Sequence, residues 1–447
     1  MQEDQFTRMT ETPVQKLILT LSVPTIISML VTNIYNLVDT AFVGTLGNSA
    51  SGAVGVVFGF MSILQAIGFM FGQGAGSIIS RRLGSKNIEE ARTTASTGFI
   101  TAFVLAIIAA IICYINLDSL VILLGSTKTI APYAKTYISY ILLAAPFMAT
   151  SFTLNNFLRY EGKANLGMIG LMTGAIINIA GDAVFMFGLK MGIAGAGLST
   201  AISQIISFSI LISMFLRGKT ACRISFKYYR LDFGLIWEIM STGFPSMLRQ
   251  GLNSLTTIFL NNYAGVYGDE AVAAMSIVSR VMFFTFSVAI GVGQGFQPVS
   301  GFNYGAKKYS RVKEGYKFTF VMATIILLVM FVLVQVCSGN IIGIFRDDPK
   351  VIEIGTRALR LQSLAQILLP VCMATEMLYQ STGHKLGATV LSATRSGLFF
   401  IPALIILANV RGLAGIQEAQ PVAMVLSVIP ALYCARRFFK NLPEDGN

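Results

Sequence analysis

The chain has 447 residues, of which 54% are hydrophobic and only 12% are charged, and its mean hydropathy is +0.69. Soluble domains carry about 25% charged residues, so this composition excludes an ordinary soluble protein and indicates a membrane protein with many spans. The net charge of +12 raises the question of nucleic-acid binding. The basic residues, however, lie in short segments between apolar runs, as membrane orientation requires, and we expect no nucleic-acid partner.

Apolar runs separated by polar segments predict an all-α integral membrane protein with twelve transmembrane helices. The predicted spans are residues 17–41, 51–78, 93–115, 135–158, 165–188, 193–216, 236–264, 271–297, 316–338, 357–381, 386–408 and 413–435. The first run is too long for the core of a cleaved signal peptide, so we expect it to stay as the first span. Most Lys and Arg residues lie before the first span, after the last, and in alternate loops. This pattern places both termini in the cytoplasm.

The first apolar run, residues 16–44, contains one proline and ends in a carboxylate. Pro24 removes an internal hydrogen bond and is expected to act as a hinge in this helix. Tyr35 and Asp39 are four residues apart and therefore share one helix face. A carboxylate inside the bilayer is costly and is a functional candidate by default.

One constant, ungapped shift of the chain on itself aligns its two halves. It pairs Pro24 with Pro245, and the tripeptide Gly72-Gln73-Gly74 with Gly293-Gln294-Gly295. The same shift also aligns Gly44 with Gly265, Gly47 with Gly268, Gly84 with Gly305, Lys86 with Lys307, and Gly162 with Gly383. A shared apolar bias does not produce such matches, so we interpret the chain as an internal repeat.

The repeat predicts two six-helix bundles, residues 1–216 and 236–447, joined by a cytoplasmic linker at 217–235. Because six is an even number, both bundles have the same orientation in the membrane. We therefore expect a pseudo-two-fold axis along the membrane normal and a binding cavity between the bundles.

Positions at which the two copies differ in charge are candidates for function. Asp39 aligns with Leu260 and Asp182 with Ala403, so only the first half has these two carboxylates. The depths of the spans bring a set of polar residues to the outer part of the first half, where they can form one cluster. This predicted cation-coupling cluster consists of Tyr35, Asp39, Asn178, Asp182 and Thr200.

Carboxylate, amide and hydroxyl oxygens suit a hard monovalent cation or shared protons, whereas a soft metal would require His or Cys. Two neighbouring carboxylates also titrate as a pair. The cluster therefore predicts coupling to H⁺ or to Na⁺, and a candidate Na⁺ site consists of Asp39, Asn178, Asp182 and Thr200. A purely structural role for the buried aspartates is the alternative.

The second half has cationic residues where the first half has small ones. Arg249, Arg280 and Arg395 align with Ser28, Gly59 and Gly174, and Glu376 aligns with Asn155. These four charged residues are candidates for a substrate cavity. An internal ion pair of Glu376 with Arg249 or Arg395, or snorkelling of the arginines to the membrane surface, remains an equally good interpretation.

No motif indicates an enzyme. The sequence contains no nucleophile motif, phosphate-binding loop or metal-ligand cluster, and its five cysteines have no spacing typical of a metal site or a disulfide. We therefore expect a protein that is not an enzyme and has no cofactor other than the coupling ion. We also expect it to act as a monomer.

Several motifs together resemble the multidrug and toxic compound extrusion (MATE) family, within the larger group that includes lipid-linked oligosaccharide flippases. The matching residues are Pro24, the segment Asn36 to Gly44 containing Asp39, Gly72-Gln-Gly74 followed by Arg81-Arg-Leu-Gly84, Arg159-Tyr-Glu-Gly162, Asn178-Ile-Ala-Gly-Asp182, and Gly192-Ile-Ala-Gly195-Ala-Gly197. The resemblance covers essentially the whole chain.

The resemblance implies secondary active efflux of amphipathic, mainly cationic compounds in exchange for H⁺ or Na⁺, by alternating access, in a prokaryotic plasma (inner) membrane. In members similar to the prokaryotic DinF-like type, the cluster matched here by Tyr35, Asp39, Asn178, Asp182 and Thr200 is the cation site, and bending at the proline that Pro24 matches couples it to substrate release. Two alternatives remain. One is a flippase of lipid-linked precursors, and the other is export of anionic or zwitterionic compounds by the arginines of the second half.

Overall fold

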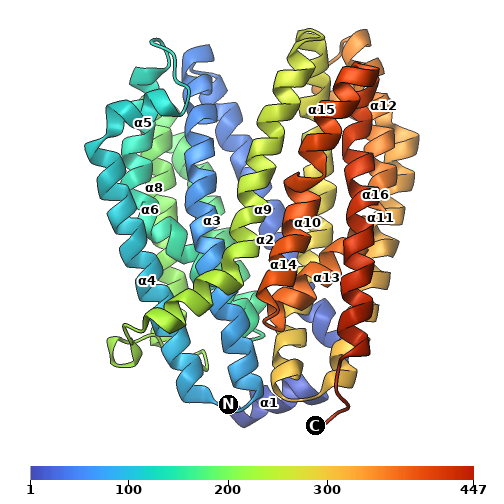
Figure 1. Ribbon diagram of the computed structural model, residues 1–447. Coiled ribbons are helices and arrows are strands. Elements are labelled where there is room, and N and C mark those ends of the chain that lie inside the picture. Colours follow the sequence, from blue (N-terminus) through green and yellow to red (C-terminus); the bar gives the residue numbers. More distant parts are fainter. Residues whose placement is uncertain (1, 447) are drawn as a thin grey trace. The chain divides into compact units, whose positions relative to one another are not determined.

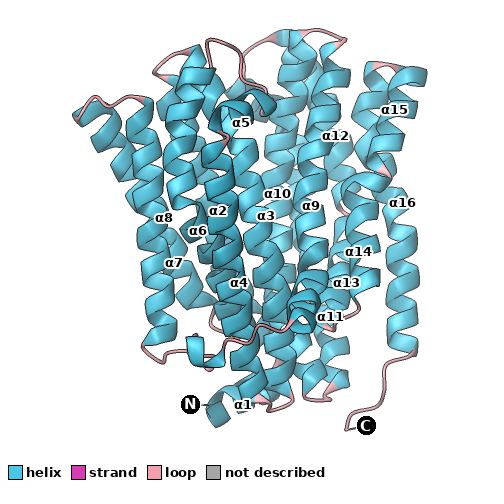
Figure 2. Cartoon of the chain, turned by 60° about the vertical axis from the view of Figure 1, so that its left-hand side comes forward, coloured by secondary structure: helices cyan, strands magenta, loops and turns pink. Residues whose placement is uncertain are grey.

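The computed structural model describes residues 2–446, except for the side chains of residues 2–4 and 48, and within these residues helix is the only regular structure (Figures 1 and 2). The α-helices are α1 (Gln2–Glu11), α2 (Val14–Gly44), α3 (Asn48–Gly84), α4 (Ile88–Ile115), α5 (Leu117–Leu123), α6 (Ala131–Tyr160), α7 (Ala164–Asp182), α8 (Ile193–Leu216), α9 (Phe233–Gly265), α10 (Asp269–Gly305), α11 (Tyr309–Phe345), α12 (Pro349–Gln366), α13 (Leu369–Ser381), α14 (Lys385–Ala393), α15 (Phe400–Arg411) and α16 (Leu413–Lys440). Two π-helical segments, η1 (Ala183–Gly188) and η3 (Thr394–Leu398), and a 3-10 turn, η2 (Phe226–Tyr228), complete the set.

Most of the predicted spans coincide with these helices. In the described part of the chain, 10 helices are long and apolar enough to cross a membrane, or up to 11 if α12 and α13, which meet at an angle of 49°, form one bent span. The remaining predicted span is α9, which has 33 residues and is long enough to cross the bilayer. It is less apolar than the other spans because it has more polar side chains, including Glu238, Arg249 and Asn253.

The chain forms two compact units, and the boundaries between them lie inside α2 and α9. Unit 1 comprises residues 1–10 and 27–247, and unit 2 comprises residues 11–26 and 248–447. The boundary in α2 follows shortly after Pro24, and the boundary in α9 follows shortly after Pro245. The predicted bundles, 1–216 and 236–447, assign these leading segments differently. A proline removes one intrahelical hydrogen bond, so the segments before and after it can pack against different neighbours.

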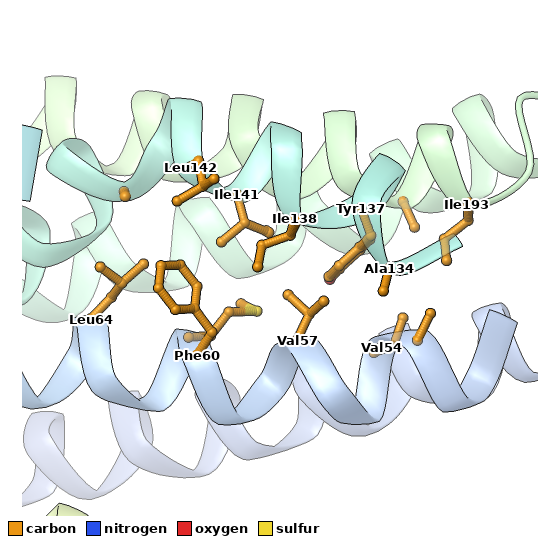
Figure 3. Close-up of a cluster of buried hydrophobic side chains, with 14 of the residues drawn as sticks. Val54, Val57, Phe60, Leu64, Ala134, Tyr137, Ile138, Ile141, Leu142 and Ile193 are labelled. Carbon is orange, nitrogen blue, oxygen red and sulfur yellow. The ribbon is translucent and has the colours of Figure 1, made fainter. Parts of the chain in front are cut away.

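Unit 1 is built around α6, which is buried along most of its length. This helix packs against α3, α4, α7 and α8. Figure 3 shows how Tyr137, Ile138 and Ile141 of α6 face Val57 and Phe60 of α3. In a membrane, close helix packing depends on small residues and van der Waals contact, and α6 supplies buried alanines at this interface.

Unit 2 is built around α10, which packs against α11, α12 and α13. Its apolar core joins α9, α10, α12 and α15 through residues such as Leu260, Met275, Leu359 and Leu404. The helices α4 in unit 1 and α11 in unit 2 are among the least buried of the spans. In the most apolar segment of each, only 17% of the residues are buried. These two helices therefore present apolar faces that suit lipid contact.

The repeated tripeptides lie where two helices cross closely. In unit 1, Gly74 of α3 lies against the Ile239 carbonyl in the leading segment of α9, and a Cβ added at Gly74 would overlap that oxygen. In unit 2, Gly295 of α10 lies in the same way against Ser22 in the leading segment of α2. The hydroxyl of Ser22 also donates a hydrogen bond to the Val292 carbonyl at 3.2 Å. Glycine is therefore required at these crossings because only it lets the two backbones approach.

A buried carboxylate directly after α6 holds the segment that follows α8 in place. Glu161, 1% exposed, accepts hydrogen bonds from the backbone N–H groups of Ala221 at 2.9 Å and Cys222 at 3.1 Å. Burial raises the pKa of the Glu161 carboxyl, although Lys163 and these two N–H groups act in the opposite direction. Burial beside Glu161 also raises the pKa of the Cys222 thiol well above its usual range.

Candidate functional site

Asp39 of α2 is buried in unit 1, with an exposure of 8%. The hydroxyl of Tyr137 on α6 donates a hydrogen bond to its Oδ2 at 3.2 Å, while its Oδ1 has no hydrogen-bond partner among the described residues. Tyr35, one helical turn earlier, is also buried and interacts with the Gln204 side chain. The structure therefore places Tyr35 and Asp39 together, as their spacing predicted.

The other three predicted residues lie on α7 and α8. Asn178 donates a hydrogen bond from Nδ2 to the Thr200 hydroxyl at 3.2 Å, and Ser199 donates one to the Asn178 carbonyl at 2.8 Å. Asp182 is fully buried at the end of α7, directly before the π-helical segment η1. π-Helical segments are rare and occur frequently at functional sites.

The carboxyl groups of Asp39 and Asp182 interact directly, although they come from α2 and α7. All five residues of the predicted coupling cluster therefore gather in unit 1. Apart from this contact between the carboxyl groups and an interaction of Asp182 with the Ser199 side chain, four of their buried oxygens have no hydrogen-bond partner among the described residues: Oδ1 of Asp39, Oδ1 of Asn178, and both carboxyl oxygens of Asp182. Buried polar atoms are normally paired, so this arrangement suits a ligand that these oxygens can bind.

The set of donors fits a hard cation or protons. Within the described residues, no group of three or more His, Cys, Asp or Glu could hold a metal ion, which leaves no candidate for a transition-metal site there. Carboxylate, amide and hydroxyl oxygens are the ligands that hard cations prefer. Asp39, Asn178, Asp182 and Thr200 therefore fit the Na⁺ site predicted from the sequence, and the carboxyl pair equally suits proton exchange.

Sequence reasoning missed Tyr137, whose hydroxyl interacts with both Asp39 and Thr200. Figure 3 shows its ring among the apolar side chains between α6 and α3. The alignment of the two halves contains a signal for it, because Tyr137 has Ala358 as its counterpart. This difference between the two halves is one of a hydroxyl and not of a charge, so a comparison of charged positions does not reveal it.

Three of the four charged candidates of the second half form a buried triad in unit 2. Arg249 Nη1 lies 2.5 Å from Glu376 Oε1, and Arg395 Nη2 lies 3.6 Å from Glu376 Oε2. The side chains of the two arginines are 6% exposed and that of Glu376 is 1% exposed. Arg280, in contrast, lies on an exposed face of α10. The structure therefore brings together Arg249, Glu376 and Arg395 and leaves Arg280 apart.

Arg395 also lines a cavity of ≈ 190 Å³ within unit 2. The same cavity is lined by amide side chains that the sequence did not single out, namely Asn253, Gln362, Gln366 and Gln420. An amide side chain inside a predicted span indicates a binding site only weakly, because isolated amides in membrane helices also serve helix packing.

Long apolar helices, paired buried carboxylates and a buried charged triad together define a polytopic membrane transporter. The MatE family model matches residues 24–184 and 245–406, once in each half of the repeat. The chain therefore belongs to the MATE family, whose members are transporters and not enzymes.

Named relatives match almost the whole chain. The multidrug export protein MepA of Staphylococcus saprophyticus is 28% identical over 433 residues, covering 97% of this chain and 96% of that protein. MepA of Staphylococcus haemolyticus is 28% identical over 446 residues, covering 100% of this chain and 98% of that protein.

Solved structures confirm the fold. An outward-facing multidrug resistance MATE transporter of the MOP superfamily superposes with a TM-score of 0.92 at 24% identity, covering 97% of this chain and 98% of that chain. A MATE transporter in complex with MaD3S superposes with a TM-score of 0.90 at 26% identity and the same coverage. The prediction of an all-helical MATE-type membrane protein is thereby confirmed.

Proposed function

We propose that this protein is a secondary active transporter that exports amphipathic, mainly cationic compounds in exchange for H⁺ or Na⁺ by alternating access. The observation that carries the proposal is the buried, directly interacting pair of Asp39 and Asp182, which belongs to the same cluster as an Asn178 amide oxygen that has no hydrogen-bond partner among the described residues. The relatives named as multidrug export proteins support the choice of substrates.

Coupling follows from the position of Asp39 on α2. Binding of H⁺ or Na⁺ removes a buried charge, so occupancy of the cluster changes the relative stability of two conformations of that helix. Pro24 lies just before the point where α2 passes from unit 2 to unit 1, which makes it the proposed hinge. The membrane potential contributes about 2.3 kcal/mol per charge per 100 mV, enough for a roughly fortyfold concentration gradient.

The side chains of the cluster are sufficient to bind either Na⁺ or H⁺. For Na⁺, oxygens of Asp39, Asn178, Asp182 and Thr200 would be the ligands, and Tyr137 would orient Asp39. For H⁺, the two carboxyl groups would share and release protons as a pair. Tyr35 is buried one helical turn before Asp39 and interacts electrostatically with it.

The proposed setting is the plasma (inner) membrane of a prokaryotic cell, with both termini in the cytoplasm and a monomer as the working form. The concentration of Lys and Arg in the termini and in alternate loops supports this orientation, because cytoplasmic loops carry an excess of basic residues. The position of the coupling cluster in the first half, with Asp39 and Asp182 absent from the second, supports a DinF-like type within the family.

The test of this function is counter-ion-driven export of a cationic dye in proteoliposomes. Asp39→Asn keeps the size of the side chain but removes its charge, and we expect it to abolish export. Asp118→Asn is the matched control, because the Asp118 side chain is 81% exposed. Undiminished export by Asp39→Asn would contradict the proposal. The same dye under separately imposed pH and sodium gradients identifies the coupling ion.

One observation favours a second function, the flipping of lipid-linked precursors. The buried triad has two arginines and one carboxylate, and a basic cavity is what a pyrophosphate group requires. The paired carboxylates of unit 1 have no role in that function. Replacing Arg249 and Arg395 by Glu, followed by parallel assays of lipid flipping and dye export, separates the two functions.

A further inference from the structure

The cavity of unit 2 combines a cationic group with neutral hydrogen-bonding groups. It lies among α9, α10, α12, α15 and α16, and Arg395 of η3 forms part of its wall. Around Arg395 the wall carries Asn253 and Thr256 of α9, Gln362 of α12 and Gln420 of α16. Among the residues that the structure describes, no Asp or Glu side chain lines it.

The triad behind this wall has a surplus of one positive charge. Glu376 is within hydrogen-bonding distance of Arg249, at 2.5 Å, and these two charges compensate each other. Arg395 is 3.6 Å from the second oxygen of Glu376, which is beyond hydrogen-bonding distance. Arg395 therefore shares Glu376 with Arg249 as its counter-charge and makes the longer of the two contacts with it, and it is adjacent to the cavity.

Arg395 is also poorly supplied with hydrogen-bond acceptors. Its side chain is 94% buried, since only 6% is exposed, and its Nε and Nη2 atoms have no acceptor among the described residues. Its guanidinium lies over the ring of Phe286, 5.0 Å from the centroid, and Phe286 also lines the cavity. A buried guanidinium with free N–H groups is costly unless a ligand supplies the acceptor.

We propose that this cavity is a subsite for the carboxylate of an aromatic acid or zwitterion, which Arg395 binds through its fork of N–H groups. The inference rests on the proposed export function and assigns to Arg395 the recognition of substrates that bear a carboxylate. At ≈ 190 Å³ the cavity is smaller than the roughly 300 to 1,000 Å³ typical of sites for whole drug-sized ligands. It therefore accommodates the acidic end of a substrate, and the rings of Phe283, Phe286 and Phe400 suit an aromatic group beside the carboxylate.

The test uses three small probes of the same shape and different charge: benzoate, benzamide and benzamidine. Binding to the purified full-length protein in detergent is measured by calorimetry, without any transport. We expect benzoate to bind at least tenfold more tightly than benzamide, because hydrogen bonds to charged groups are the stronger ones, and benzamidine to bind least. Equal binding of the three probes would overturn the proposal, and this comparison requires no variant to fold.

Variants then assign the binding to Arg395. Arg395→Gln leaves the Arg249–Glu376 pair in place and is expected to lower the affinity for benzoate tenfold or more, while Arg395→Lys keeps the charge and loses the fork. Arg357→Gln is the matched control, because Arg357 is in the same unit with a side chain that is 57% exposed. Unchanged benzoate binding by Arg395→Gln would overturn the proposal. Tighter binding of phenyl phosphate than of benzoate would overturn the choice of a carboxylate.

The failure of this inference is distinguishable from the failure of the proposed function. Asp39→Asn is expected to lose counter-ion-driven export and to bind benzoate like the wild type, since Asp39 belongs to unit 1 and the cavity to unit 2. Loss of benzoate binding in Arg395→Gln supports the carboxylate subsite, whatever the export of a cationic dye by that variant. Export that persists in Asp39→Asn contradicts the coupling mechanism without affecting the subsite.

Discussion

The hydroxyl of Tyr137 donates a hydrogen bond to Oδ2 of Asp39 at 3.2 Å, and both side chains are buried. This bond links the centre of unit 1, α6, to the helix that carries Pro24. Because it satisfies one oxygen of Asp39, it orients the carboxyl group, and it leaves the rest of that group to interact with Asp182 or with a coupling ion. Tyr137 is therefore a positioning residue of the proposed coupling site.

Tyr137→Phe removes this hydrogen bond and keeps the ring that packs between α6 and α3. A hydrogen bond to a charged group contributes about 1.5 to 3 kcal/mol, so we expect counter-ion-driven export to fall roughly tenfold or more. Transport of a dye into proteoliposomes at several counter-ion concentrations measures this. Tyr114→Phe, at a residue that is 60% exposed, is the control, and equal export by the two variants would contradict the role of Tyr137.

The triad of unit 2 predicts an order of stability among its variants. Glu376→Gln leaves two buried guanidinium groups without a counter-charge and is expected to cost about 3 to 5 kcal/mol. Arg395→Gln keeps the close pair of Arg249 and Glu376 and is expected to cost only about 1 kcal/mol. Thermal unfolding in detergent measures both. A stability for Glu376→Gln equal to that of Arg395→Gln would show that Glu376 does not compensate Arg249.

The glycine crossing in unit 1 predicts a cost for a single added methyl group. Gly74→Ala places a Cβ against the Ile239 carbonyl, and we expect it to destabilise the protein by about 1 to 3 kcal/mol. Gly55→Ala, in the same helix, meets nothing within 4 Å and is expected to stabilise the helix by about 0.5 to 1 kcal/mol. Unfolding temperatures of the two variants should therefore shift in opposite directions, and a shift of the same sign would argue against the close crossing.

The raised pKa of Glu161 predicts a dependence of stability on pH. Folding favours the protonated form of this carboxyl, so its contribution to stability is fully present below its ordinary pKa of 4.5 and is lost as the pH rises through the higher pKa of the folded state. Glu161→Gln has no such ionisation, but it loses one acceptor for the N–H groups of Ala221 and Cys222, a constant cost of about 1 to 3 kcal/mol.

We therefore expect the stability of Glu161→Gln relative to the wild type to improve as the pH rises from about 4 to 8. The pH-independent cost of the lost acceptor does not change this trend. Unfolding measured over this range in detergent tests the sign. A relative stability that falls with rising pH would mean that the folded state prefers the ionised carboxylate.

Much of the proposed coupling site could be predicted because its signal is local. A carboxylate inside an apolar run is expensive wherever the run packs, so Asp39 and Asp182 were recognisable from one sequence, and helical spacing placed Tyr35 and Asn178 beside them. Tyr137 was not recognised, because a tyrosine in a membrane helix is unremarkable until its hydroxyl is seen to meet a carboxylate. Arg280 was selected for its charge alone, and nothing local distinguishes an exposed arginine from a buried one.

The sequence by itself determined that this is a helical membrane protein with an internal repeat and an asymmetric distribution of charge, because composition and periodicity follow from the cost of placing each residue in lipid. Only the tertiary structure decided that α2 and α9 each pass from one unit to the other just after a proline. It alone also decided that Glu376 pairs closely with Arg249 and leaves Arg395 beside a cavity. Contacts of this kind depend on which residues distant in the chain come within a few ångströms of each other, and this depends on how the helices pack.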